Sequence, residues 1–213
     1  MRRIVGVIGI TLLMMMPNWI VDPKGRRLPE ASWPPERAAA GDLELVRRFC
    51  NTINRENGAD RFATPGGFDE WLLGEGRTPT RPSRHDLGRI VAFREALHAI
   101  TRANQDRRVT YSELADVTDK VTDVGYRLRA TPSGLELVPE APTPSAVFLG
   151  ELALICMRAD DDGTLGRLKS CAHCQWTIYD ASKNQSGRWC SMSICGTRHN
   201  ARAYRQRHRA GTV

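Results

Sequence analysis

Residues 171–198 read CAHCQWTIYDASKNQSGRWCSMSICGTR and contain four of the six cysteines of this 213-residue chain. Two residues separate Cys171 from Cys174, and a loop of fifteen residues then leads to Cys190 and Cys195. Two close pairs of thiolates at this spacing are typical of a tetrahedral zinc site. Because four protein ligands fill the coordination shell of zinc, we predict one structural Zn²⁺ ion with no open position for catalysis.

An arginine-rich segment follows the last cysteine directly. We predict that residues 196–209 form a helix that begins at this zinc ligand. On such a helix four arginines fall within an arc of roughly 60°; they are Arg198, Arg202, Arg205 and Arg209. Guanidinium groups on one face repel each other unless anions neutralise them, which favours contact with a nucleic acid over a solvated basic face. We include Arg188 among the predicted contacts.

Positive charge is confined to this tail. Residues 167–213 hold nine Lys or Arg and one acid, a balance of +8, whereas the rest holds 22 bases and 23 acids, a balance of −1. The formal net charge of +7 therefore belongs to the cysteine-containing part. A neutral body that carries a basic zinc module indicates a polyanionic partner, and we expect double-stranded DNA.

The other two cysteines, Cys50 and Cys156, stand alone in apolar stretches with helical spacing, as small buried hydrophobic residues do. Paired metal spacing beside a basic segment favours zinc in a reducing compartment over a disulfide framework. We therefore expect a cytoplasmic protein.

The N-terminus leaves three interpretations open. Met1-Arg-Arg precedes the apolar run 4–16, which ends in three methionines and is followed by Pro17. The run resembles a signal peptide or short anchor, but its length is marginal for a membrane span and no small-residue cleavage site follows closely. The other two interpretations are a buried or unstructured segment and the product of a start codon assigned too early. We favour the early start, and a membrane is the less expected partner.

Hydrophobic residues recur at helical spacing through the middle of the chain. The predicted helices run from Asp42 as N-cap to about 57, over 68–74, from a Ser83–Asp86 capping box to about 104, from Ser112 as N-cap to about 122, and over 145–159. Alternating residues predict a β-hairpin of 124–131 and 135–138 around Pro132-Ser-Gly.

These patterns predict a mainly α (α+β) protein. An apolar segment and linker (1–41) precede a helical domain with one β-hairpin (42–160). A small treble-clef-like or ribbon-like zinc finger with a basic C-terminal helix follows (167–210). No nucleophile, carboxylate pair or phosphate-binding glycine loop has the spacing that catalysis requires, so we expect a protein that is not an enzyme.

The tail resembles the CGNR zinc finger of bacterial, often actinobacterial, regulators. The resemblance lies in the two cysteine pairs, in Arg188-Trp-Cys-Ser-Met and in Cys195-Gly-Thr-Arg. The body is similar to the ABATE domain that accompanies this finger, through Cys50-Asn-Thr-Ile, Phe68-Asp-Glu-Trp-Leu and Phe93-Arg-Glu-Ala-Leu. The chain departs from the family pattern at Gly187, Thr197 and Asn200, which affects the expected nucleic-acid contacts and leaves the metal ligands unchanged.

The resemblance implies a stress-related transcriptional regulator without naming its target. Our leading hypothesis is a DNA-binding regulator in which the helical domain senses an effector or associates and the finger helix contacts the duplex. A small-molecule effector and a homodimer are both compatible with it. The alternative is a zinc adaptor that binds RNA or an acidic protein surface without sequence-specific recognition of DNA.

Overall fold

The computed structural model describes residues 20–21, 27–28, 37–106 and 109–210, and it divides the chain into two units, 1–30 and 31–213. In the first unit, β1 (Ile20–Val21) pairs antiparallel with β2 (Arg27–Leu28). The apolar run 4–16 lies outside the described residues, so its three interpretations stay open. Within the described ranges, no helix has both the length and the apolar character needed to cross a bilayer.

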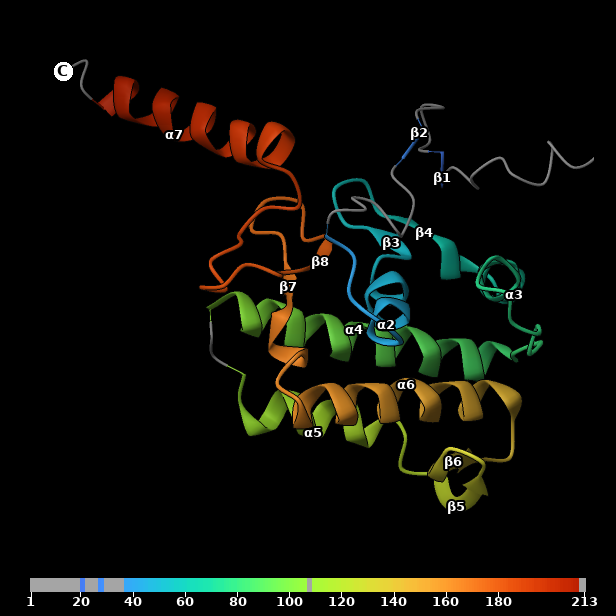
Figure 1. Cartoon of the computed structure of the whole chain (residues 1–213). Coiled ribbons are helices and arrows are strands. Elements are labelled where there is room, and N and C mark those ends of the chain that lie inside the picture. The colour runs from blue at the N-terminus through green and yellow to red at the C-terminus, as the bar shows by residue number, and fades with distance from the viewer. Residues whose placement is uncertain (1–19, 22–26, 29–36, 107–108, 211–213) are drawn as a thin grey trace, which may run out of the picture. The chain divides into compact units, whose positions relative to one another are not determined.

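The second unit is mainly helical, as the sequence predicts (Figure 1). Its helices are α2 (Leu43–Cys50), α3 (Pro65–Gly74), α4 (Arg84–Asp106), α5 (Tyr111–Asp119), α6 (Pro144–Asp161) and α7 (Thr197–Ala210). Its strands form antiparallel pairs: β3 (Ile53–Asn54) with β4 (Ala59–Asp60), β5 (Gly125–Thr131) with β6 (Gly134–Glu140), and β7 (Leu168–Ser170) with β8 (Thr177–Tyr179).

An aromatic cluster holds the helices together. Helices α4 and α6 run side by side and α2 packs against both (Figure 1). From α2, the ring centre of Phe49 lies 5.7 Å from that of Trp71, 6.3 Å from Phe93 and 6.0 Å from Phe148. These four side chains are buried, and aromatic pairs at such separations add stabilisation beyond the area that they bury.

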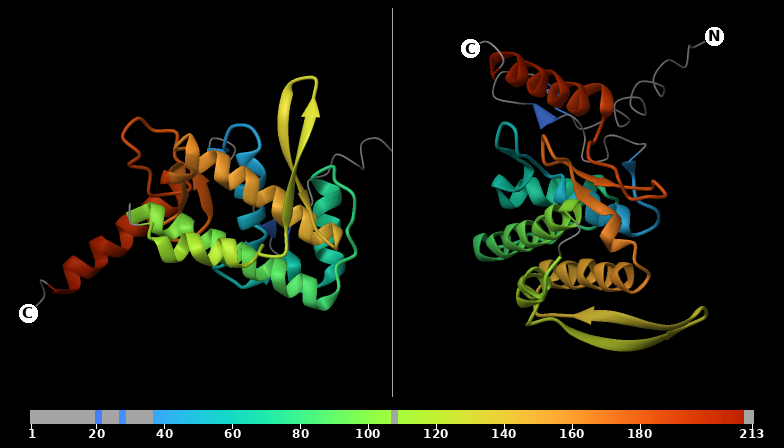
Figure 2. Two further views of the ribbon diagram at one scale, coloured as in Figure 1. Left: turned by 90° about the horizontal axis from the view of Figure 1, so that it is seen from below. Right: turned by 90° about the vertical axis from the view of Figure 1, so that its left-hand side faces the viewer.

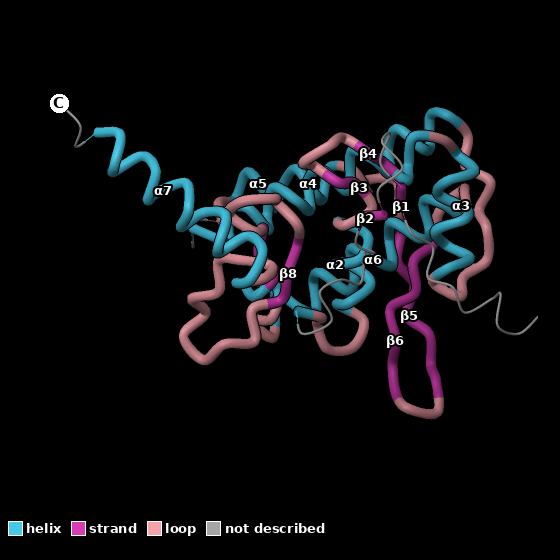
Figure 3. Tube along the Cα trace, turned by 90° about the horizontal axis from the view of Figure 1, so that it is seen from above, coloured by secondary structure: helices cyan, strands magenta, loops and turns pink. Residues whose placement is uncertain are grey.

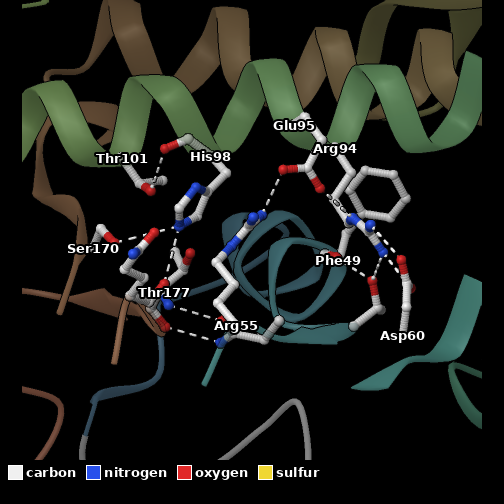
Figure 4. Close-up of polar contacts among 12 residues, drawn as sticks. Phe49, Arg55, Asp60, Arg94, Glu95, His98, Thr101, Ser170 and Thr177 are labelled. Atoms are coloured by element: carbon white, nitrogen blue, oxygen red, sulfur yellow. Dashed lines mark hydrogen bonds and ion pairs between the residues drawn. The ribbon is translucent and has the colours of Figure 1, made fainter. Parts of the chain in front are cut away.

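An ion pair between buried Arg94 and half-buried Asp60 fixes the β3–β4 hairpin against α4. The guanidinium of Arg94, which is 1 % exposed, donates to both carboxylate oxygens of Asp60 at 2.7 Å (Figure 4). Burial alone would raise the pKa of Asp60, but the hydrogen bonds and charge of Arg94 outweigh it and lower this pKa. The pair leaves no uncompensated charge in the core.

Two details of the first helices differ from the prediction. Helix α2 ends at Cys50 rather than near residue 57, because the chain leaves the helix at Asn51 and forms the β3–β4 hairpin. Asp42 precedes α2 but makes no side-chain cap, and Oε2 of Glu44 accepts a hydrogen bond from the Ala39 N–H instead.

Later elements follow the pattern more closely. The predicted capping box of α4 is present, since the Ser83 and Asp86 side chains bond to each other and to each other's backbone N–H. The cap of α5 is Thr110, not Ser112, because Glu113 closes a capping box with Thr110. The β5–β6 hairpin is present as predicted and forms a long ribbon (Figure 2).

The β7–β8 hairpin packs on α4 and α2. Asn104, near the end of α4, donates to the carbonyl oxygens of Leu165 at 3.0 Å and Leu168 at 2.8 Å. Both leucines are buried in the core of the helical body. The chain therefore re-enters this core before it reaches the cysteines, and the segment around them is mostly loop (Figure 3).

Candidate metal centre and basic helix

The first cysteine pair lies in the turn of the β7–β8 hairpin. The backbone N–H of Cys171 donates to the carbonyl oxygen of Trp176 at 2.8 Å, and that of Gln175 donates to Cys171 at 2.9 Å. Gln175 takes a positive φ of 61°, which lets the chain reverse tightly between the strands. This local geometry brings the sulfurs of Cys171 and Cys174 to the same side of the turn.

The second pair lies where the basic helix begins. Cys190 ends the loop after β8, and Cys195 lies in a wide helical turn, Met192–Gly196, directly before α7. A Cβ on Gly196 would lie 2.8 Å from Met192 Sδ and 3.4 Å from Trp189 Cδ1. Gly196 thus serves close packing against these side chains.

The four predicted ligands converge. The sulfur atoms of Cys171, Cys174, Cys190 and Cys195 all lie within 4.8 Å of one another. The Sγ atom of Cys190 is 3.6 Å from that of Cys174 and 3.5 Å from that of Cys195. A tetrahedral zinc ion with bonds of about 2.3 Å requires sulfur separations of roughly 3.8 Å, so this donor set fits one structural Zn²⁺ ion.

The four sulfurs are close enough to share protons when no metal is bound. Hydrogen bonds from the thiols of Cys174 and Cys190 lower the pKa of Cys171, and the same contacts raise the pKa of Cys174. A divalent cation that displaces the shared protons allows all four sulfurs to be thiolates, which is the form that zinc binds.

A buried ion pair supports the loop between the two cysteine pairs. Nζ of Lys169 lies 2.9 Å from Oδ2 of Asp180, and these side chains are 2 % and 0 % exposed. Burial would raise the pKa of Asp180, but hydrogen bonds from Ser182, Lys169 and the Gly187 N–H outweigh it and hold this pKa at about 2. Asp180 thus holds the turn at Ser182 and supports the loop from a buried position.

The same carboxylate explains one departure from the family pattern. A Cβ at position 187 would lie 2.8 Å from Cγ of Asp180. Because both Asp180 and its partner Lys169 are buried, the carboxylate has no room to move away. Glycine at position 187 therefore permits the close contact between the loop and Asp180.

Buried polar contacts join the metal centre to the helical body. Nδ2 of Asn51 donates to the carbonyl oxygen of Thr177 at 2.9 Å, and Oδ1 of Asn51 accepts from the Thr177 N–H at 2.7 Å. From α4, Nε2 of His98 lies 3.0 Å from the carbonyl oxygen of Gln175 and 3.3 Å from Oγ of Ser170 (Figure 4). Ser170 and Gln175 immediately flank the first cysteine pair, so α2 and α4 both hold the zinc knuckle.

The basic helix presents its arginines to solvent. The side chains of Arg198, Arg202 and Arg205 are exposed, as is that of Arg188, while the side chain of Arg209 lies outside the described part. Every residue of α7 from Thr197 to His208 is exposed except Ala203, which is half-buried. A helix that is polar all round gains little from burial, so α7 depends for its position on Cys195 and its turn.

One acid of the helical body approaches this helix. Oε1 of Glu56, in the loop between β3 and β4, lies 3.4 Å from Nη1 of Arg198 and 3.9 Å from Nε2 of His173. Glu56 and Arg198 are each about half exposed, so the attraction is screened by water. The contact gives the first arginine of the helix a competing anionic partner.

Two family models match the chain. Residues 167–208 match the CGNR zinc finger, and residues 43–161 match the ABATE model, described as "Putative stress-induced transcription regulator". The second match covers more than half of the chain. The chain belongs to the ABATE family. It carries the CGNR zinc finger at its C-terminal end, and the resemblance seen in the sequence is confirmed. No curated protein matches this ABATE protein.

Sequence patterns missed the residues that attach the finger. Asn51 lies within the helix predicted to run to about residue 57, and no role is predicted for His98 or Lys169. Their partners lie 126, 77 and 11 residues away along the chain. The only signal for them is a polar residue within an otherwise apolar stretch, which marks burial without naming a partner.

Proposed function

We propose that this ABATE protein is a DNA-binding transcriptional regulator that acts through binding and not through catalysis. In this proposal the zinc ion fixes the turn at Cys195, and the turn presents α7 to the duplex. The observation that carries the proposal is the exposed row of Arg198, Arg202 and Arg205 on the helix that begins beside the zinc site.

The charges on this helix support a polyanion as the partner. None of the described residues of α7 is acidic, and Glu56 of the helical body lies 3.4 Å from Arg198. Arginines at this spacing repel each other on a free helix. Phosphates relieve that repulsion, and a helix of 14 residues, about 21 Å long, matches a traverse of the DNA backbone.

A second candidate partner is RNA, because α7 carries exposed rings and the loop before it carries a half-buried tryptophan. Tyr204 is 58 % exposed, and its ring centre lies 4.1 Å from that of His208. The Trp189 ring lies 4.7 Å from that of His199. Unpaired bases stack on such rings in single-stranded complexes, so RNA or single-stranded DNA is the competitor that the test includes.

The test compares two double variants of the zinc-loaded full chain. Arg202 and Arg205 are changed to Ala in the first, and Arg207 with Lys183 in the second. Arg207 is nine residues after Arg198, which places it on the opposite face of α7. Affinity for a duplex is measured across a salt series, because each lost phosphate contact lowers the magnitude of the salt slope by about 0.9.

We expect the first variant to bind duplex DNA at least about tenfold more weakly at low salt, with a slope shallower by about two. The control variant should keep more of its affinity and more of its salt slope, although it loses the same formal charge. Equal losses in the two variants would indicate general charge attraction without a defined face. A preference for single-stranded RNA over the duplex at physiological salt would favour the second candidate.

A further inference from the structure

A cleft of about 550 Å³ lies between the helical body and the zinc finger. One wall is the C-terminal half of α4, the next is the first turn of α5, and the third is the zinc knuckle with Arg188. The size lies within the range of sites for small molecules. A ligand in this cleft would contact both parts that the family models match.

Two arginines on different walls face this cleft without an ionic partner. The side chains of Arg102 in α4 and Arg188 in the finger form no salt bridge or hydrogen bond with the residues that the structure describes, although the Arg188 guanidinium lies 5.6 Å from the centre of the Trp189 ring. Other arginines of the body, such as Arg89 with Asp123, are paired with acids. The cleft therefore offers two available cations.

Two carboxylates line the same cleft. Asp106 lies one helical turn after Arg102, and the two form no ion pair. Glu113 is the other, and hydrogen bonds from the Thr110 side chain and backbone lower its pKa, so it is ionised at neutral pH. The formal charges of the four ionic side chains sum to zero.

A buried acceptor and small side chains complete the lining. Oε1 of Gln105 is buried and accepts no hydrogen bond from the described residues, which costs free energy unless a ligand or water donates to it. Between the polar groups, small apolar side chains line the cleft. They are those of Ala99, Ala103 and Ala172.

We propose that this cleft binds a small zwitterion, with one carboxylate and one ammonium group, of the size of an amino acid or dipeptide. The ligand carboxylate binds Arg102 and Arg188, and the ammonium group binds Asp106 and Glu113. A simple anion would meet two carboxylates in the same cleft, and a simple amine would meet two arginines. The site shares Arg188 with the predicted nucleic-acid contacts, but its binding of a zwitterion is testable without DNA.

The experiment screens the protein amino acids and a set of dipeptides against the zinc-loaded full chain at pH 7.5. Thermal shift identifies binders, and isothermal titration calorimetry measures their affinity. For each binder, the matching amine without the carboxylate and the matching acid without the amine are titrated as well. We expect at least one zwitterion to bind, and each matched compound to bind about tenfold or more weakly.

Variants test the position of the ligand. Arg102→Gln and Asp106→Asn each remove one exposed charge of the cleft and should weaken binding about tenfold or more. Arg129→Gln, on the exposed β5–β6 hairpin, is the matched control and should leave affinity unchanged. The proposal is overturned if no compound of the panel binds, if an acid without an amine binds as tightly, or if both cleft variants bind like the control.

Discussion

Asn51 of α2 forms two hydrogen bonds with the backbone of Thr177 in β8, one through each polar atom of its amide, at 2.9 and 2.7 Å. Both residues are buried, at 1 % and 0 % exposed. The amide completes the edge of β8 as another strand would. The helical body and the zinc finger are therefore joined by a specific polar contact in addition to apolar packing.

Replacing this amide should destabilise the protein. Asn51→Ala leaves a buried N–H and a buried carbonyl of Thr177 without these partners, at a cost of about 2–4 kcal/mol. Urea unfolding of the zinc-loaded chain measures the loss. Asn200→Ala, at an exposed position of α7, is the control and should change the free energy of unfolding by less than about 0.5 kcal/mol. A similar result for both variants would show that the contact contributes nothing specific.

The zinc site gives a second prediction. Metal analysis of the purified chain should find one zinc per chain, and Cys190→Ser should reduce this to near zero, because the three remaining thiolates no longer fill the shell. Cys156→Ala is the matched control, since Cys156 is buried in α6 away from the cluster. Full zinc occupancy in the Cys190 variant would mean that another group, such as His173, completes the site.

The buried ion pair of Lys169 and Asp180 gives a third prediction. Lys169→Met leaves the Asp180 carboxylate buried without its cation, which should cost about 3–5 kcal/mol. Since this pair supports the loop that leads to Cys190, the variant should also release zinc faster to a chelator. Lys183→Met removes an exposed lysine of the same loop and should have little effect on either quantity. Unchanged zinc release in the Lys169 variant would separate the loop from the metal site.

The sequence predicts correctly those features that depend on residues close together in the chain. The spacing of Cys171 and Cys174 predicts a knuckle because two residues are enough to close the turn, and the hairpin around Ser133 follows from its turn residues. The end of α2 was predicted wrongly because Asn51 finds its partner in β8, far along the chain. The burial of Asp180 against Lys169 could not be predicted either, because nothing nearby in the sequence shows that these two side chains meet.

His98 should make stability depend on pH. Burial, followed by the positive charge of Arg55, lowers its pKa from 6.5 to about 4, although the Gln175 carbonyl and Glu95 oppose this shift and Arg102 adds to it. The unfolded chain therefore binds more protons than the folded chain between pH 6.5 and 4. Stability should be fully present above pH 6.5 and fall as the pH decreases through this window.

The expected loss between pH 7.5 and pH 5.5 is about 1.4 kcal/mol for a group with these two pKa values. His98→Gln keeps a donor for the Gln175 carbonyl and removes the titration. Because thiolate protonation and zinc loss affect both proteins alike, the difference between their free energies of unfolding isolates His98. Urea unfolding at several pH values with excess zinc should show this difference shrinking by about 1.4 kcal/mol as the pH falls. A difference that stays constant would mean that His98 is not held neutral at the junction.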